Sequence, residues 1–194
     1  MGLGARGIMI ILLFLSIWSV AIMIDRNSVF KKEIGKADLA EARKLIQSKN
    51  WESLKSWGER NPSFASGAVL SAITSEARTS EHIDRAVQSY YAEKRLTLER
   101  GLNFLATLAA NSAFIGLLGT VMGIIQSFGL LSAQQGSAMG AVMFGLAEAL
   151  LTTAIGIFVA VPAAIAYNHF SGRLRTAVLE ANSLKDLYVA KVGT

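Results

Sequence analysis

A run of 47 residues without a single Asp, Glu, Lys or Arg, residues 101–147, constrains this sequence more than any other feature. Two further uncharged blocks occupy residues 7–24 and 149–172. Charged residues make up only 17% of the chain, against roughly 25% in an average soluble domain, and they are concentrated between these blocks. Apolar blocks of this length exclude a soluble globular domain and a disordered chain. They predict an all-α integral membrane protein.

The first membrane span is predicted at residues 7–24, because a helix of that length covers about 27 Å, close to the thickness of the hydrocarbon core. A signal peptide is the alternative, since Arg6 precedes the apolar run and residues 19–21 loosely resemble a cleavage site. The run stops only at Asp25, which favours a helix that is not cleaved.

The longest uncharged block must fold back on itself. As one helix it would measure about 70 Å, more than twice the hydrocarbon core. The polar, glycine-containing stretch 132–137 predicts the turn. The second and third spans are therefore predicted at residues 103–131 and 139–168, and both are expected to be long helices that extend into the cytoplasm.

The distribution of positive charge predicts the orientation. Of the 19 Lys and Arg residues, 14 lie in residues 25–100 and four in the tail, whereas one precedes the first span and none lies in the hairpin turn. The positive-inside rule then places residues 25–100 and the C-terminus in the cytoplasm, and the N-terminus and hairpin turn on the outer side of the membrane. The predicted parts are an N-terminal helix (1–24), a cytoplasmic helical region (25–100), a transmembrane hairpin (101–172) and a cytoplasmic tail (173–194).

The cytoplasmic region is predicted to be helical throughout. Residues 38–48 carry apolar side chains at helical spacing. Asn61, followed by Pro62, predicts the N-cap and first position of a helix that runs to about residue 78. Thr79 and Ser80 cap the next helix, and since nothing interrupts its pattern, residues 80–131 are predicted to form one long helix that projects below the membrane.

Several kinds of chemistry are excluded by residue type. The chain has no cysteine, and its two histidines, His82 and His169, lie far apart with no metal-binding spacing. A GxGxxG match at residues 2–7 precedes a membrane span instead of a βαβ unit, and no P-loop occurs. The formal charge of +5 is interleaved with acids, so it indicates cytoplasmic bias and no nucleic-acid binding. We expect no metal, cofactor, catalytic residue or enzymatic activity.

Glu148 is the only acidic residue within the predicted spans, and it lies about 13 Å from the outer end of the third helix. A carboxylate at this depth costs a few kcal/mol unless it is protonated, paired or hydrated. One interpretation is a protonated side chain bonded to a neighbouring helix; the other is a residue that lines an ion-accessible cavity. Thr152, one turn further, shares its face, and Thr120 in the second span is another candidate for the cavity wall.

Small residues recur at four-residue spacing in the second and third spans, and such stripes let helix backbones approach closely. A polar stripe of Asn103, Thr107 and Asn111 follows the inner half of the second span. Because one hairpin cannot bury all of these faces, they predict oligomerisation around a central cavity, although packing within one subunit would use some of them. The small residues are Gly116, Gly119 and Gly123 in the second span and Ala141, Gly145, Ala149 and Thr153 in the third.

Two ordered strings carry a resemblance to a known family. They are Phe114-Ile-Gly-Leu-Leu-Gly-Thr-Val-Met-Gly123 and Gly145-Leu-Ala-Glu-Ala-Leu-Leu-Thr-Thr-Ala-Ile-Gly156, followed by Val161-Pro162-Ala163 and Tyr167-Asn168. The sequence resembles the ExbB/TolQ group of the ExbB–TolQ–MotA proton-channel family. The likeness covers the whole predicted order of span, cytoplasmic insert, hairpin and tail.

The resemblance implies a homopentamer that encloses single-span partners of the ExbD/TolR type and is driven by the proton motive force. It also implies a periplasm-spanning partner of the TonB/TolA type. The family's pore threonines fall on Thr120 and Thr153, and its intramembrane glutamate falls on Glu148. Thr152, Asn111 and Thr107 are additional candidates for the pore wall.

The sequence departs from many relatives at three positions, with Ala113 in place of proline, Met122 in place of tryptophan and Thr152 in place of alanine. None of these changes removes a family pore residue. Iron-uptake, outer-membrane-maintenance and gliding complexes share these motifs, so the subfamily stays open. A non-conducting membrane scaffold and a stand-alone channel or transporter are the alternatives; three unequal spans lack the repeated halves of a transporter.

Overall fold

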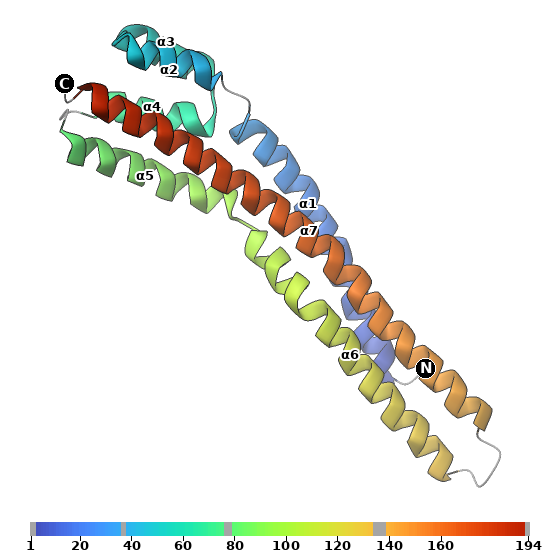
Figure 1. Cartoon of the computed structure of the whole chain (residues 1–194). Coiled ribbons are helices and arrows are strands. Elements are labelled where there is room, and N and C mark those ends of the chain that lie inside the picture. The colour runs from blue at the N-terminus through green and yellow to red at the C-terminus, as the bar shows by residue number, and fades with distance from the viewer. Residues whose placement is uncertain (1–2, 36–37, 76–78, 134–138, 193–194) are drawn as a thin grey trace. The chain divides into compact units, whose positions relative to one another are not determined.

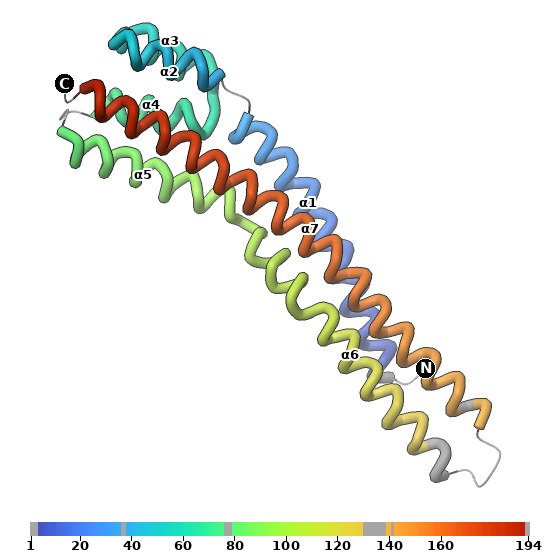
Figure 2. The backbone as a smooth tube through the Cα atoms, viewed as in Figure 1, coloured from blue at the N-terminus to red at the C-terminus, as the bar shows by residue number. Residues whose placement is uncertain are grey.

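The computed structural model describes residues 3–35, 38–75, 79–133 and 139–192, and these residues are almost entirely helical (Figures 1 and 2). Three of the helices are long and apolar enough to cross a membrane: α1, α6 and α7. The predicted class, an all-α integral membrane protein, is confirmed. The helices among the described residues are α1 (Leu3–Glu33), α2 (Leu39–Gln47), α3 (Trp51–Arg60), α4 (Phe64–Ile73), α5 (Ser80–Leu98), α6 (Leu102–Ala133) and α7 (Met139–Val192).

The chain divides into two compact units. Residues 1–24 and 101–168 make up the first unit, and residues 25–100 and 169–194 make up the second. Since α1 and α7 are continuous helices of 31 and 54 residues, each contributes to both units.

Within the first unit, α6 runs beside the first half of α7, and α1 packs against both (Figure 1). The core of this packing is Leu108 of α6 with Val159 and Ala163 of α7, and Leu15 of α1 lies against it. Large apolar side chains cover the outside of the unit; Phe158, for example, is 77% exposed. Such a surface is unstable in water and stable in lipid.

The second unit is a helical bundle with an aromatic core. Phe64 at the start of α4 stacks on Tyr91 of α5, with ring centroids 5.3 Å apart. The Tyr91 hydroxyl donates to Asn182 Oδ1 of α7 at 3.1 Å, and Lys185 Nζ pairs with Asp84 Oδ1 at 2.7 Å. These contacts tie α5 to the C-terminal part of α7.

The two adjacent tyrosines of this core stay protonated over the physiological range. Burial, together with Glu33 and Glu93 nearby, raises the pKa of Tyr90 to about 12. Burial and the nearby Asp186 also raise the pKa of Tyr91. The Tyr91 hydroxyl therefore remains a donor to α7 throughout the neutral pH range.

The helix predicted to have Asn61 as its N-cap has Ser63 as its N-cap instead, two residues later. The prediction was therefore wrong about the N-cap, and it was also wrong about where the helix ends. The Asn61 side chain instead donates to the Trp57 carbonyl at 3.0 Å and closes α3. Ser63 is the N-cap of α4 and forms a reciprocal capping box with Ser66, which satisfies two backbone donors. The helix ends at Ile73, well short of residue 78.

The single helix predicted over residues 80–131 was also wrong. The helix breaks between α5 and α6 at Gly101, whose φ is +78°. Residues other than glycine adopt this left-handed conformation only at an energetic cost. Arg26 stabilises the end of α5, because its guanidinium donates to the Thr97 carbonyl at 2.7 Å. The turn predicted at residues 132–137 lies for the most part outside the described residues.

We expect Gly101→Ala to destabilise the protein by about 1 kcal/mol or more. A Cβ atom at this position would sit at a positive φ and 3.0 Å from Ile22 Cγ2. The thermal unfolding midpoint in mild detergent, followed by circular dichroism, should fall by about 2–4 °C. Gly7→Ala in α1 is the matched control, because its added Cβ would meet nothing within 4 Å. Equal unfolding midpoints for the two variants would contradict the left-handed conformation of Gly101 and the helix break that depends on it.

Candidate functional site

The candidate site lies inside the packed hairpin of α6 and α7, where two threonine hydroxyls meet. Thr120 Oγ1 of α6 contacts Thr153 Oγ1 of α7. Thr153 Oγ1 also donates across the interface to the Gly116 carbonyl at 3.1 Å, and Thr120 Oγ1 reaches the Ala149 carbonyl at the same distance. A short chain of polar atoms thus joins the two helices inside their interface.

Glycines let the two backbones come close enough for these hydroxyls to meet. A Cβ atom at Gly116 would lie 2.9 Å from the Thr152 carbonyl oxygen and 3.1 Å from the Gly156 Cα. A Cβ atom at Gly123 would lie 2.7 Å from the Cβ of Ala149. Any larger residue at these positions would force the helices apart.

The remaining small residues follow the same arrangement. Gly119 faces the methyl group of Thr152, and Gly145 faces the hydroxyl of Ser127. The stripes that suggested contacts between subunits therefore face each other within one subunit. These stripes account for the close packing of α6 against α7 and do not support a ring of subunits. A Gly145→Leu substitution would therefore disturb the hairpin itself, and its effect could not be used to measure assembly.

Glu148 lies on α7 next to this cluster, one position before Ala149. Its side chain is half-buried, and its Oε1 atom is fully buried. Its backbone carbonyl accepts a hydrogen bond from Thr152 Oγ1 at 3.2 Å. Glu148 thus precedes Thr153 by five residues on α7, or about 7.5 Å along the helix axis.

The other candidates occupy different surroundings. Thr152 is completely buried, and its hydroxyl is used by its own helix, so its role is packing against α6. Thr107 and Asn111 are exposed, and their side chains bond to carbonyls one turn earlier in α6. Asn111 lies nine residues before Thr120, about 13 Å along the helix. They form a separate polar stripe on the surface of the unit.

Two buried serines belong to the interface and were not predicted. Ser112 is fully buried, and its carbonyl oxygen would lie 2.6 Å from a Cβ at Gly156. Ser127 packs against Gly145. The sequence holds a signal for both, because each is four residues from a glycine of the α6 stripe and thus lies on the same face.

The hydroxyl pair can act in two ways. Each hydroxyl is both a donor and an acceptor. The pair can therefore exchange hydrogen-bond partners and bind water molecules in an adjacent cavity. It can also serve as a clamp, since Thr hydroxyls in membrane helices often bond a neighbouring backbone. Fold and site together define an integral membrane protein whose tightly packed hairpin holds a polar cluster and the half-buried carboxyl group of Glu148.

The MotA/TolQ/ExbB proton channel family matches residues 59–183, and the chain belongs to this family. The matched region contains α6, the hydroxyl pair and Glu148. Membership rests on nearly two thirds of the chain.

Individual relatives match over shorter stretches. The Tol-Pal system protein TolQ of Pseudomonas aeruginosa is 46% identical over 93 residues, which are 48% of this chain and 40% of that protein. The biopolymer transport protein ExbB of Xanthomonas campestris pv. campestris is 42% identical over 92 residues, 47% of this chain and 36% of that protein. The TolQ of Haemophilus influenzae is 49% identical over 78 residues, 40% and 34% of the two chains. The chain thus matches less than half the length of each of these relatives.

Proposed function

We propose that this chain is the proton-channel subunit of an ExbB/TolQ-type complex in a bacterial inner membrane, which couples the proton motive force to work on periplasmic or outer-membrane partners. The observation that carries the proposal is the Thr120–Thr153 pair beside Glu148, in a hairpin that is otherwise free of charge, within a family of proton channels. Moving one charge through 100 mV releases about 2.3 kcal/mol, so a few protons suffice to change a partner's conformation.

The moving proton needs a second acidic group, which we assign to a single-span partner of the ExbD/TolR type. This chain offers one carboxyl group per subunit within the predicted spans, Glu148. A partner helix with an acid at the depth of Thr120 and Thr153 would complete the path. A periplasm-spanning protein of the TonB/TolA type is the proposed recipient of the work.

Assembly into a ring, which we expect to be a pentamer, is supported by the exposed polar stripe of α6. Thr107 and Asn111 are exposed on a helix that is otherwise apolar, and a polar side chain is costly against lipid. A ring would turn this stripe toward a neighbouring subunit or a hydrated interior. The proposed orientation, with the N-terminus in the periplasm and the C-terminus in the cytoplasm, follows from the charge distribution.

Two other functions remain as alternatives. A scaffold without ion flux is favoured by one observation, namely that both threonine hydroxyls reach backbone carbonyls and could serve packing alone. A gliding-type motor stator of the same family would use the same residues with a different partner.

The assembly is tested by the mass of the purified complex. We expect the chain, co-expressed with a single-span protein that carries one intramembrane Asp, to purify in mild detergent as several copies bound to that protein. Native mass spectrometry would read the number of copies of each. A monomeric chain that never binds the partner would contradict the proposal.

A further inference from the structure

Two exposed leucines on neighbouring helices of the second unit lie outside its core. Leu96 of α5 is 79% exposed, and Leu179 of α7 is 60% exposed. Both lie among charged residues, with Arg95 beside Leu96 and Glu180 beside Leu179, so neither leucine lies in hydrocarbon. Two large apolar side chains on adjacent helices, covered neither by the core nor by lipid, mark a candidate contact surface.

α5 and the C-terminal part of α7 run antiparallel, and their contacts show which residues lie at the same level (Figure 1). Asp84 Oδ1 pairs with Lys185 Nζ at 2.7 Å. The Tyr91 hydroxyl donates to Asn182 Oδ1 at 3.1 Å. The levels of all other residues on these two helices follow from the two contacts, at about 1.5 Å per residue.

Two exposed residues of opposite charge share one of these levels. Arg85 directly follows Asp84, and Asp186 directly follows Lys185. The side chains of Arg85 and Asp186 are 74% and 71% exposed. The internal pair has its acid on α5 and its base on α7, whereas the exposed residues have the base on α5 and the acid on α7. A second copy of α7 beside α5 would therefore meet a complementary charge.

The exposed leucines lie on the same faces as these charges. Leu96 is eleven residues from Arg85, or about three turns along α5. Leu179 is seven residues from Asp186, or about two turns along α7. Leu179 also lies at about the level of Ala92, an exposed residue one turn from Leu96. Each helix thus presents one charge and an apolar surface that complement the exposed face of the other helix.

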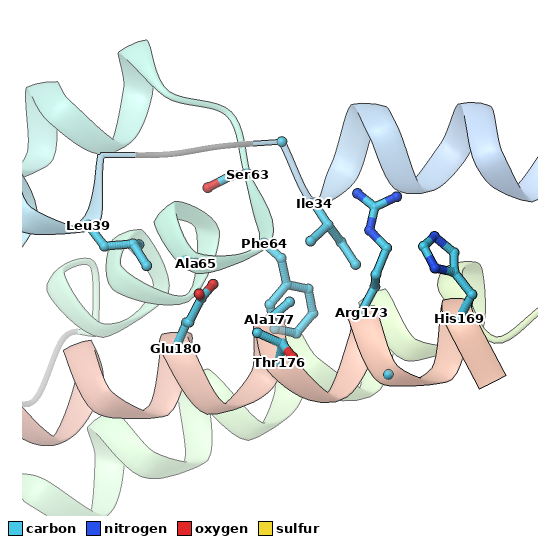
Figure 3. A pocket seen from close by; sticks show the side chains of 12 residues that line it. Ile34, Leu39, Ser63, Phe64, Ala65, His169, Arg173, Thr176, Ala177 and Glu180 are labelled. Carbon is cyan, nitrogen blue, oxygen red and sulfur yellow. The ribbon is translucent and has the colours of Figure 1, made fainter.

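These faces stay uncovered within the part of one subunit that the structure describes. A different side of α7, which carries Arg173, borders a cavity of about 530 Å³ between the end of α1 and the start of α4 (Figure 3). That side faces other helices of the same unit, and Leu179 and Asp186 are not among the residues that line the cavity. The face of α7 with Leu179 and Asp186 is therefore free for a second molecule.

We propose that α5 of one copy packs against the C-terminal part of α7 of a second copy. Leu179 of the second copy packs between Ala92 and Leu96, and its Asp186 pairs with Arg85. Copies in one membrane are related by rotation about the membrane normal, so each residue keeps its depth and the levels within one copy also apply between copies. Repeated around an axis, the contact closes a ring, and the inference rests in this respect on the ring in the proposed function.

The competing explanation is a solvated face. Arg85 pairs with Glu81 of its own helix at 2.6 Å, and Asp186 pairs with Lys185 at 3.1 Å. Exposed pairs of this kind contribute little to stability, and single exposed leucines are common on protein surfaces. On a solvated face, the reversal of one charge leaves assembly unchanged. At a contact between copies, one reversal weakens assembly and the second reversal restores it.

The test is a charge exchange, measured by native mass spectrometry of the full chain in mild detergent at the concentration that half-assembles wild type. Arg85→Glu and Asp186→Arg each place like charges across the contact, and we expect each to lower the assembled fraction at least about threefold. The double variant restores opposite charges and should assemble like wild type. Lys55→Glu, a reversal at an exposed position of α3, is the matched control and should leave assembly unchanged.

Cysteine cross-linking tests the same contact without a change of charge. The native sequence has no cysteine, so the assay has no background. Chains with Ala92→Cys, mixed with chains with Leu179→Cys, should form disulfide-linked pairs. Chains with Lys55→Cys, mixed with chains with Leu179→Cys, should not.

Two failures can be told apart. A wild-type ring that tolerates both single reversals and gives no cross-link overturns this contact and leaves the proposed function in place. A monomeric wild type overturns both. Single reversals that weaken assembly but are not rescued in the double variant overturn the charge pairing. If a reversal variant does not fold, the absence of the cross-link overturns the contact alone.

Discussion

Gly156→Val should prevent α6 and α7 from packing and should cost the protein several kcal/mol of stability. A Cβ atom at Gly156 would lie 2.6 Å from the Ser112 carbonyl oxygen and 2.9 Å from the Gly116 Cα. Both are backbone atoms, so no side-chain rotation relieves the overlap and the helices must separate. Separation would also break the contact between Thr120 and Thr153. The unfolding midpoint in mild detergent, measured by circular dichroism, should fall by at least 6 °C, or the variant should fail to accumulate.

The matched control is Gly140→Val, which makes the same change in the same helix at a position with nothing within 4 Å of the added Cβ. It should unfold close to wild type, because it carries the helix-propensity cost without the overlap. Gly156→Ala provides a graded variant if valine is not tolerated. Midpoints that agree among Gly156→Ala, Gly156→Val and Gly140→Val would show that the hairpin does not pack as described.

Thr153→Val should reduce coupling at least tenfold while the protein still assembles. Valine keeps the volume of threonine but removes the hydroxyl that reaches Thr120 and the Gly116 carbonyl. A charge that passes an apolar wall loses the polar groups that stabilise it, and the barrier rises by the cost of that lost interaction. Rescue of a deletion strain in a phenotype that depends on the proton motive force is the measurement, with the mass of the complex checked in parallel. Thr120→Val should behave in the same way.

Two neighbouring substitutions separate a pathway role from packing. Thr153→Ser keeps the hydroxyl and should retain most of the coupling. Thr152→Val makes the identical change one residue away, where the hydroxyl bonds only to the Glu148 carbonyl of the same helix in the described structure. It should retain coupling. If Thr153→Val and Thr120→Val both assemble and fully rescue the deletion strain, the assignment of these residues to the proton path is wrong. The scaffold without ion flux is then the favoured function.

Glu148→Gln is the companion substitution. Glutamine keeps the shape and hydrogen bonding of the side chain but cannot ionise. Full rescue by this variant would assign Glu148 a structural role within the hairpin, whereas loss of rescue with intact assembly would place its carboxyl group on the proton path.

The membrane spans could be predicted because the bilayer acts on composition over long windows. The uncharged block 101–147 is too long for one helix, and it is indeed divided between α6 and α7. The break at Gly101 was missed because a glycine within a helical pattern is compatible with both continuation and a positive φ. Asn61 was mistaken for a cap because an Asn–Pro pair suits a helix start, whereas the local bond to the Trp57 carbonyl decided the outcome.

The site could be predicted only as separate residues. Glu148 was marked as the only acidic residue in the predicted spans, and spacing marked the glycine stripes. Thr120 was marked as a hydroxyl in an apolar span, and the family resemblance marked both Thr120 and Thr153. That the two hydroxyls meet depends on the register between α6 and α7, which is determined by contacts such as Gly116 with Gly156 and Gly123 with Ala149. A single sequence holds no information about that register. Because the register was unknown, the stripes of small residues were also assigned to contacts between subunits.

Proton uptake by lipid vesicles that contain this chain and its single-span partner tests the central claim most directly. A potassium gradient with valinomycin would impose the membrane potential, and a trapped pH-sensitive dye would report the flux. We predict potential-driven uptake well above that of empty vesicles, and its loss when Thr153 is replaced by valine or when the partner's intramembrane acid is replaced by its amide. An assembled complex whose uptake equals that of empty vesicles, at every imposed potential, would contradict the proposed proton channel.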